Sequence, residues 1–236
     1  MEGKLYTEAV APEMLALVRK LMADKRLDNF NLVGGTALAL QLGHRKSVDV
    51  DLFSTGAFDT SRMADYLTKQ YNAEIFRQND HAIYSYIGNV KVDIMREPHP
   101  LIDKPENPEG LRMLSTRNIG AMKMNAIHDN GGRIKDFADI HKLLEKDSLS
   151  TYPDYTRQKY PEVNPLHLKR LLVDQPNADL DDRVHYIGKP VEWHEMASRL
   201  REAYRNPGRI FGEVHELKNE QRIHKAPWQR RGHRPG

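Results

Sequence analysis

The spacing of apolar positions changes along the chain, and each change predicts an element. Helical spacing covers 8–26, 37–42, 61–71, 115–128, 134–145, 165–173, 190–204 and 210–223. Strand-like runs cover 30–33, 48–53, 74–77, 82–87 and 90–95. Four prolines predict a loop over 97–110, and 152–160 fits neither pattern. Strands and helices alternate up to 95 and helices follow, so the expected fold is α+β, a mixed sheet with flanking helices and a helical C-terminal part.

Composition limits the classes to which this chain can belong. With 236 residues, of which 39% are hydrophobic, the chain is long enough for one generous domain, or for one domain with an extension. The absence of cysteine excludes disulfides, zinc–thiolate sites and thiol catalysis. Neither an apolar N-terminal signal region nor a run of about 18 apolar residues is present. We therefore expect a soluble cytoplasmic protein without a membrane partner.

The formal net charge of +3 is unevenly distributed. Residues 222–236 contain five lysines and arginines and no acid, a local charge of +5 that leaves the rest of the chain at −2. A basic tail can attract RNA or another polyanion. It can equally be a solvated, disordered end, and composition alone favours this second interpretation.

Three aspartates are the first candidates for chemistry. In the strand 48–53, Asp49 and Asp51 alternate with apolar residues and therefore share one face. Two adjacent carboxylates suit Mg²⁺, which prefers hard oxygen ligands and leaves room for substrate phosphates. Asp93 lies between apolar neighbours, a costly position unless the carboxylate is paired or bound to metal. If its strand lies beside 48–53, the three acids converge; otherwise Asp93 faces water at a strand edge.

Gly34-Gly35-Thr36 lies between a predicted strand and a predicted helix. Glycine lets the backbone approach a ligand closely, and free N–H groups at a helix N-terminus suit a triphosphate. The Thr36 hydroxyl is a candidate additional donor. The dinucleotide-binding pattern G-x-G-x-x-G and the P-loop pattern are both absent. Arg45 and Ser47, just before the aspartates, are candidates to contact phosphate or to brace the glycine turn.

Two runs of residues resemble a known family. The run NLVGGTALALQLGHRKSVDVDLFS, over 31–54, resembles the AbiEii/AbiGii-type nucleotidyltransferase toxins of the DNA polymerase β-like nucleotidyltransferase superfamily. The run NIGAMKMNAIHDNGGRIKDFADIHKLL, over 118–144, is also similar. There the family places a lysine on one helix and K-D-x-x-D on the next, which correspond to Lys123 and to Asp136 and Asp139. The resemblance covers about 28–146 and does not extend to the C-terminal helices and tail.

The resemblance implies an enzyme and the roles of its residues. It implies a nucleotidyltransferase domain over 1–150, whereas helical spacing and charge predict the helical extension over 151–223 and the basic, disordered tail over 224–236. The activity would be transfer of NMP from an NTP to a hydroxyl, dependent on Mg²⁺ or Mn²⁺. The implied metal ligands are Asp49, Asp51 and Asp93, the implied charge-neutralising pair is Lys123 with Asp136, and the implied nucleotide contacts are Gly34, Gly35, Thr36, Arg45, Ser47 and Asp139.

The resemblance also implies partners. The chain would be the toxin of a toxin–antitoxin or abortive-infection system in phage defence, with a separate antitoxin protein as partner. RNA, in particular the tRNA 3′ end, would be the acceptor. Two alternatives stay open: nucleotidyl transfer to a small molecule or a protein, and a catalytically silent binding module of the same fold.

Overall fold

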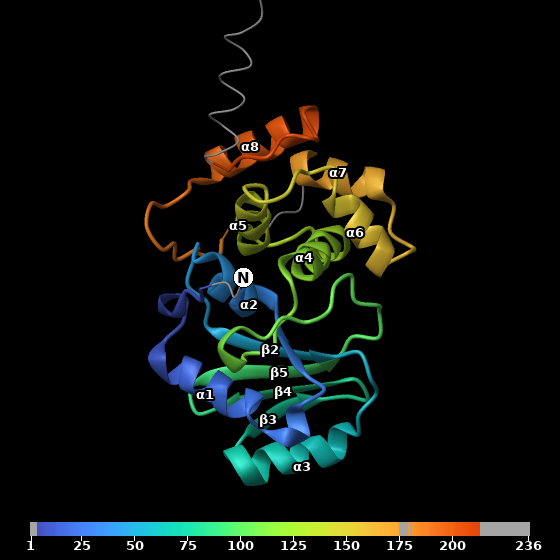
Figure 1. Ribbon diagram of the computed structural model, residues 1–236. Coiled ribbons are helices and arrows are strands. Elements are labelled where there is room, and N and C mark those ends of the chain that lie inside the picture. The colour runs from blue at the N-terminus through green and yellow to red at the C-terminus, as the bar shows by residue number, and fades with distance from the viewer. Residues whose placement is uncertain (1–3, 175–178, 180, 213–236) are drawn as a thin grey trace, which may run out of the picture.

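The computed structural model describes residues 4–174, 179 and 181–212 (Figure 1). In these residues one five-stranded sheet has the order β1-β2-β5-β4-β3. β2 and β5 run parallel, whereas the other neighbouring strands run antiparallel. The strands are β1 Asn31–Val33, β2 Asp49–Ser54, β3 Glu74–Gln78, β4 Ala82–Ile87 and β5 Val90–Arg96. The predicted mixed sheet with flanking helices is confirmed.

The helices gather on one face of the sheet and at its β1–β2 end (Figure 1). Short 3₁₀ turns lie at Thr7–Ala9, Lys25–Leu27 and Pro108–Gly110. The described α-helices are α1 Pro12–Met22, α2 Gly34–Leu42, α3 Thr60–Tyr71, α4 Thr116–Asn130, α5 Ile134–Leu143, α6 Tyr152–Lys159, α7 Pro165–Asp174 and α8 Trp193–Arg205. None of these helices is both long and apolar enough to cross a bilayer.

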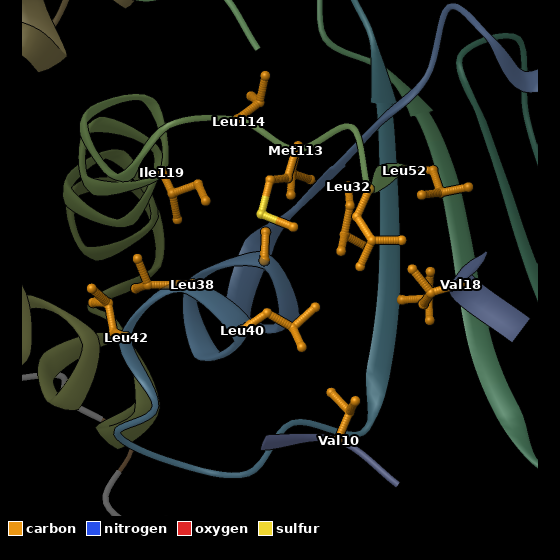
Figure 2. Packing of buried hydrophobic residues seen from close by; sticks show 14 of the residues in the cluster. Val10, Val18, Leu32, Leu38, Leu40, Leu42, Leu52, Met113, Leu114 and Ile119 are labelled. Carbon is orange, nitrogen blue, oxygen red and sulfur yellow. The ribbon is translucent and has the colours of Figure 1, made fainter. Parts of the chain in front are cut away.

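α1 and α3 cover the apolar face of the sheet. Val18 of α1 lies beside Leu52 of β2 in the buried cluster (Figure 2). At the other end of the sheet, Gln78 of β3 donates to hydroxyls of α3. Asp24, which follows α1, accepts hydrogen bonds of 2.6 Å from Tyr66 and Tyr71 of α3. The opposite face therefore carries the polar positions of β2 and β5.

α2 is the buried centre of the molecule. Leu38 and Leu42 point toward Ile119 of α4, whereas Leu40 lies on the side of Val10 (Figure 2). All five side chains are less than 10% exposed. Burial on several sides explains why this helix reads as a continuous apolar run. It begins at Gly34 instead of at the expected residue 37, so both glycines belong to its first turn.

Several predicted elements differ from the observed ones. The helix expected over 8–26 spans Pro12–Met22, because Pro12 occupies the first turn, where a missing N–H costs nothing. Val48 precedes β2 and is 65% exposed, so the strand alternation begins only at Asp49. The ambiguous run 152–160 forms α6. Of the helix expected over 210–223, the described residues 210–212 are not helical; the rest, like the tail over 224–236, lies outside the described residues.

The C-terminal helices pack on the part of the chain that contains the sheet. α6 and α7 contact α4, α8 contacts α5, and residues of α6, α7 and α8 belong to the same apolar cluster as the sheet. The stretch before α8 also contacts the first half of the chain. Tyr186 pairs with Arg45, and Asp179 pairs with Arg133, through isolated β-bridges. The division at residue 150 stays a prediction, and one continuous core crosses it.

Candidate active site

Three aspartates share the polar face of the sheet. In the parallel pair of β2 and β5, Asp51 lies directly opposite Asp93, and Asp49 lies opposite Lys91. Residues directly opposite each other on neighbouring strands project to the same face. The two strands are therefore neighbours and the acids converge, as the first of the two interpretations of Asp93 requires.

Asp51 and Asp93 lie side by side, and one buried carboxylate oxygen of the pair has no donor among the described residues. Asp93 is 5% exposed, and its Oδ2 accepts a hydrogen bond of 2.6 Å from Lys91 Nζ. No described residue donates to its buried Oδ1. Burial, reinforced by the neighbouring Asp93, raises the pKa of Asp51 to about 6. A cation at this position would supply the missing partner.

The donor set suits a hard divalent cation. The carboxylates of Asp49, Asp51 and Asp93 are the oxygen ligands that Mg²⁺ and Mn²⁺ prefer. Within the described residues, no three acidic or histidine side chains are already arranged as a metal cage. The Lys91 ammonium binds Asp93 Oδ2, so this carboxylate oxygen is already paired within the chain. The buried Oδ1 without a partner is the observation that fits a metal.

Both glycines of α2 are required by the side chains packed against them. Gly34 has φ +65°, in the left-handed region that glycine adopts without strain. A Cβ at Gly34 would overlap the Asp51 carboxylate, and one at Gly35 would overlap the Arg45 guanidinium. The helix N-terminus therefore lies in direct contact with Asp51, and its free N–H groups favour an anion.

Two hydroxyls attach α2 to β2. The Thr36 hydroxyl is fully buried, donates to the backbone carbonyl of Asp49 and lies 2.8 Å from Ser47 Oγ. We expected Thr36 to donate to a triphosphate, but its hydrogen is used inside the protein. Ser47 therefore takes part in bracing the turn, one of the two roles that the sequence left open, and it also lines the cleft described below, so a contact with phosphate stays a prediction. Both residues hold the glycine turn against the aspartate strand.

A buried ion cluster lies behind the glycine turn. Asp139 is fully buried and binds Arg45 through two hydrogen bonds, Nε–Oδ1 of 2.7 Å and Nη2–Oδ2 of 2.9 Å. Lys123 Nζ lies 2.7 Å from Asp136 Oδ1 and 2.9 Å from Asp139 Oδ2. His44 Nε2 is 2.8 Å from Asp139 Oδ1. Arg45 therefore braces the Gly35 turn through Asp139.

The cluster keeps its charges at neutral pH. Burial would raise the pKa of Asp139, but Lys123 and Arg45 outweigh it and hold this pKa well below its usual range. Burial would lower the pKa of Lys123, yet Asp139 and Asp136 leave it raised. The Asp139 carboxylate is enclosed by cations of its own chain, and the nucleotide contact expected of it stays a prediction. Asp136, also buried, holds Lys123 as expected.

A cleft of about 210 Å³ joins these groups. Its lining includes the three aspartates, Gly35 and Lys123. It also includes residues that our sequence reasoning did not assign: Lys46, Lys91, Arg133, Lys135 and His185. Lys91 could have been found, because period two places it on the face of Asp93. His185 could not, since nothing in its local sequence indicates that the stretch before α8 returns to the cleft.

A larger cavity of about 820 Å³ adjoins the cleft and has different chemistry. It lies between the start of α1 and the β4–β5 turn, and Val10, Met14, Leu17 and Val90 make much of its wall apolar. Lys46, Ser47, Val48 and His185 line both cavities. We place the chemistry in the smaller cleft because the aspartates line it.

Comparison with known proteins agrees with this geometry. Residues 15–82 match the family described as nucleotidyl transferase AbiEii toxin of type IV toxin–antitoxin systems. An uncharacterized protein of Aquifex aeolicus is 28% identical over 143 residues, which cover 58% of this chain and 69% of that protein.

Solved structures show the same fold. A Helicobacter pylori protein described as a candidate nucleotidyltransferase has a TM-score of 0.51 at 17% identity, over 88% of this chain and 94% of its own. A nucleotidyltransferase-like protein of Paracoccidioides brasiliensis has a TM-score of 0.50 at 16% identity, over 87% and 97% of the two chains. The match over 15–82 includes the glycine turn and the first two aspartates, so this part of the chain is similar to the AbiEii nucleotidyltransferases, and the described fold is similar to that of solved nucleotidyltransferase-like proteins.

Proposed function

We propose that this chain transfers NMP from an NTP to an acceptor hydroxyl with the help of Mg²⁺ or Mn²⁺. The observation that carries the proposal is the pair Asp51 and Asp93, opposite each other on parallel strands, with Asp93 Oδ1 buried and free of described donors. The glycine N-terminus of α2 contacts the Asp51 carboxylate. An acidic cation site against an anion-binding helix end is the arrangement that a metal–triphosphate complex requires.

Asp49, Asp51 and Asp93 would hold the metal. When bound, a divalent cation neutralises phosphoryl charge and polarises the α-phosphate. In the transfer, the acceptor oxygen forms a bond to the α-phosphorus while the bond to the leaving pyrophosphate breaks. Asp93 lies on the acceptor side and takes the proton of the attacking hydroxyl. The backbone N–H groups at Gly34 and Gly35 hold the triphosphate.

The cations of the cleft act on the leaving pyrophosphate. An ammonium has three N–H donors, and Asp136 and Asp139 take two of those of Lys123, which leaves one for a ligand. Arg133 and Lys135 line the same cleft. Asp136 and Asp139 therefore act as positioning residues that fix Lys123. Arg45, Ser47 and Thr36 hold the turn that carries the helix N-terminus.

The proposal extends to the biological role and to the acceptor. The matched family is described as a toxin of a type IV toxin–antitoxin system, which supports a toxin role with a separate antitoxin as partner. We propose RNA as the acceptor, in particular the tRNA 3′ end, and the cytoplasm as the site of reaction. Transfer to a small molecule or a protein, and a silent binding module, are the alternatives that the test below separates.

The test uses purified protein, each α-³²P-labelled NTP in turn, Mg²⁺ or Mn²⁺, and total tRNA. We expect label in RNA with the wild type. The rate of labelling should fall at least about 100-fold with Asp51→Asn or Asp93→Asn, because these carboxylates would hold the metal that neutralises charge during the transfer. Asp65→Asn on the exposed side of α3 is the matched control and should retain activity.

Each alternative gives a different outcome of that test. Label in a protein or a small molecule, and none in RNA, would favour the other acceptors. No labelled product with any acceptor, together with unchanged behaviour of Asp51→Asn, would indicate a silent binding module. Growth inhibition on expression that persists in Asp51→Asn would contradict the toxin mechanism.

A further inference from the structure

The face of the sheet that carries the acids continues beyond them. In register, Asp93 of β5 lies opposite Tyr84 of β4, and Tyr84 lies opposite Arg77 of β3. In the next row, Lys91 lies opposite Tyr86. Directly opposed residues share a face, so these side chains project to the same side as Asp51 and Asp93.

The continuation ends in an exposed aromatic cluster. Phe76 is 54% exposed and Tyr86 is 42% exposed, and their ring centroids lie 5.3 Å apart. Phe76 also lies 6.3 Å from the half-buried ring of Tyr84. The Arg77 guanidinium carbon lies 5.3 Å from the Tyr84 ring centroid. We call Phe76, Arg77, Tyr84 and Tyr86 the aromatic platform.

The platform stands next to the reaction centre. Neighbouring strands lie about 4.8 Å apart, so Tyr84 is one strand from Asp93 and two from Asp51. α1 and α3 cover the opposite face, and this face is open at Phe76 and Tyr86. An acceptor whose hydroxyl reaches Asp93 would therefore have its next residues over the platform.

We propose that the aromatic platform binds the last nucleotides of a single-stranded nucleic-acid acceptor and directs its 3′-hydroxyl to Asp93. The platform combines exposed aromatic rings with Arg77, and Lys91 lies in the adjoining row. Bases stack on aromatic rings and on guanidinium planes, whereas cations meet the phosphates. The proposal rests on the proposed nucleotidyl transfer and names the residues that contact its acceptor.

The edge strand argues against a protein occupant. β3 is the last strand of the sheet, and such an edge can pair with a strand from another chain. The register between β3 and β4 shifts between Ile75 and Arg77, so Phe76 lies in a bulge. A bulge interrupts the regular row of N–H and C=O groups that an added strand needs. The side chains above the face, instead of the backbone at its edge, are the part available for binding.

The experiment compares Phe76→Ala/Tyr86→Ala with the wild type and with Tyr204→Ala, a tyrosine 46% exposed on α8. A fluorescein-labelled 12-nucleotide single-stranded RNA is titrated by fluorescence anisotropy, and its KM is measured in the labelled transfer assay. We expect Kd and KM for RNA to rise about 10- to 100-fold in the double variant, because each stacked base contributes substantially. Tyr204→Ala should behave like the wild type, and Tyr86→Trp should bind RNA at least as tightly as the wild type.

NTP binding separates this proposal from the one on which it rests. NTP-dependent thermal stabilisation should be equal in the wild type and the double variant, which shows that the cleft is intact. Transfer to RNA with unchanged Kd and KM in the double variant would overturn the platform and leave the nucleotidyltransferase standing. Loss of self-association in the double variant, seen by analytical ultracentrifugation, would overturn it in favour of an interface between two copies. No labelled product from the wild type would contradict the proposed transfer, while the anisotropy titration would still test the platform.

Discussion

Asp139→Asn removes the anion at the centre of the buried ion cluster. In the folded protein four nitrogen–oxygen contacts of 2.7–2.9 Å reach this fully buried carboxylate, two from Arg45 and one each from His44 and Lys123. Asparagine keeps the shape and one acceptor oxygen but leaves Arg45 and Lys123 with Asp136 as their nearest remaining anion. Breaking a buried pair costs about 3–5 kcal/mol. We expect Asp139→Asn to lower the free energy of unfolding by about 3 kcal/mol, the lower end of this range, because the asparagine oxygen still accepts a hydrogen bond.

The free energy of unfolding is measured by urea titration at pH 7 and Tm by heating, both followed by circular dichroism. For a chain of this size, 3 kcal/mol corresponds to a fall in Tm of about 6–12 °C. The matched control is Asp182→Asn, which breaks a partly exposed 2.7 Å pair with Lys135 and should cost about 0–1 kcal/mol.

The effect should also depend on pH in a defined direction. The pKa of Asp139 is depressed in the folded state, so the stability that this carboxylate contributes is fully present above about pH 4, its unfolded value. That contribution disappears as pH falls through the folded pKa. The difference between wild type and Asp139→Asn should therefore be constant from pH 5 to 8. A cost no larger than that of Asp182→Asn would refute the argument that the cluster holds Arg45 and Lys123.

Four further predictions concern single groups. Gly34→Ala should lower the free energy of unfolding, measured in urea, by about 2 kcal/mol more than Gly88→Ala does. Both glycines have positive φ, but the space around Gly88 is open, whereas a Cβ at Gly34 would displace Asp51. Equal losses in the two variants would contradict this. In EDTA, Asp51→Asn should raise the free energy of unfolding by about 1–2 kcal/mol at pH 8 and not at pH 4. The pKa of Asp51 in the folded protein is about 6, so above that pH the carboxylate is charged and its burial is unfavourable. Calorimetry at the two pH values measures the difference in stability. Lys91→Met should tighten Mn²⁺ binding about 3- to 10-fold by isothermal titration calorimetry, because its ammonium no longer occupies Asp93; weaker binding would show that Lys91 supports the site. Lys159→Met should raise Tm at pH 7 by about 2–4 °C, because this side chain is fully buried and burial lowers its pKa more than Glu97, 3.7 Å away, raises it; the gain should shrink above pH 10, where unfolded lysine also loses its charge.

Local periodicity was sufficient to place the acids. Asp49 and Asp51 share a face because strand side chains alternate, and this rule needs no knowledge of the fold. The same rule puts Lys91 beside Asp93. Its importance became visible only with the register of β2 and β5, which sets Lys91 opposite Asp49. Sequence spacing thus predicts which side chains share a face, but not which strands are neighbours.

The roles of Arg45 and Asp139 could not be predicted in the same way. Ninety-four positions separate them, and nothing local distinguishes a phosphate-binding arginine from one that pairs with a buried carboxylate. Exposure decides between the two, and exposure depends on packing by α5. Thr36 is a similar case, because its hydroxyl suits either a ligand or the neighbouring backbone until β2 is in place.

The stretch that returns from the C-terminal half has a consequence for synthesis on the ribosome. His185 lines the cleft, and the backbone on either side of Arg45 is hydrogen-bonded to it and to Ile187. A nascent chain that has exposed the glycine turn and all three aspartates still lacks one wall of the cleft. At about 5–20 residues per second, the ribosome takes about 7–28 s to travel from Arg45 to Ile187. The wall that His185 adds to the cleft is therefore made well after the glycine turn and the three aspartates.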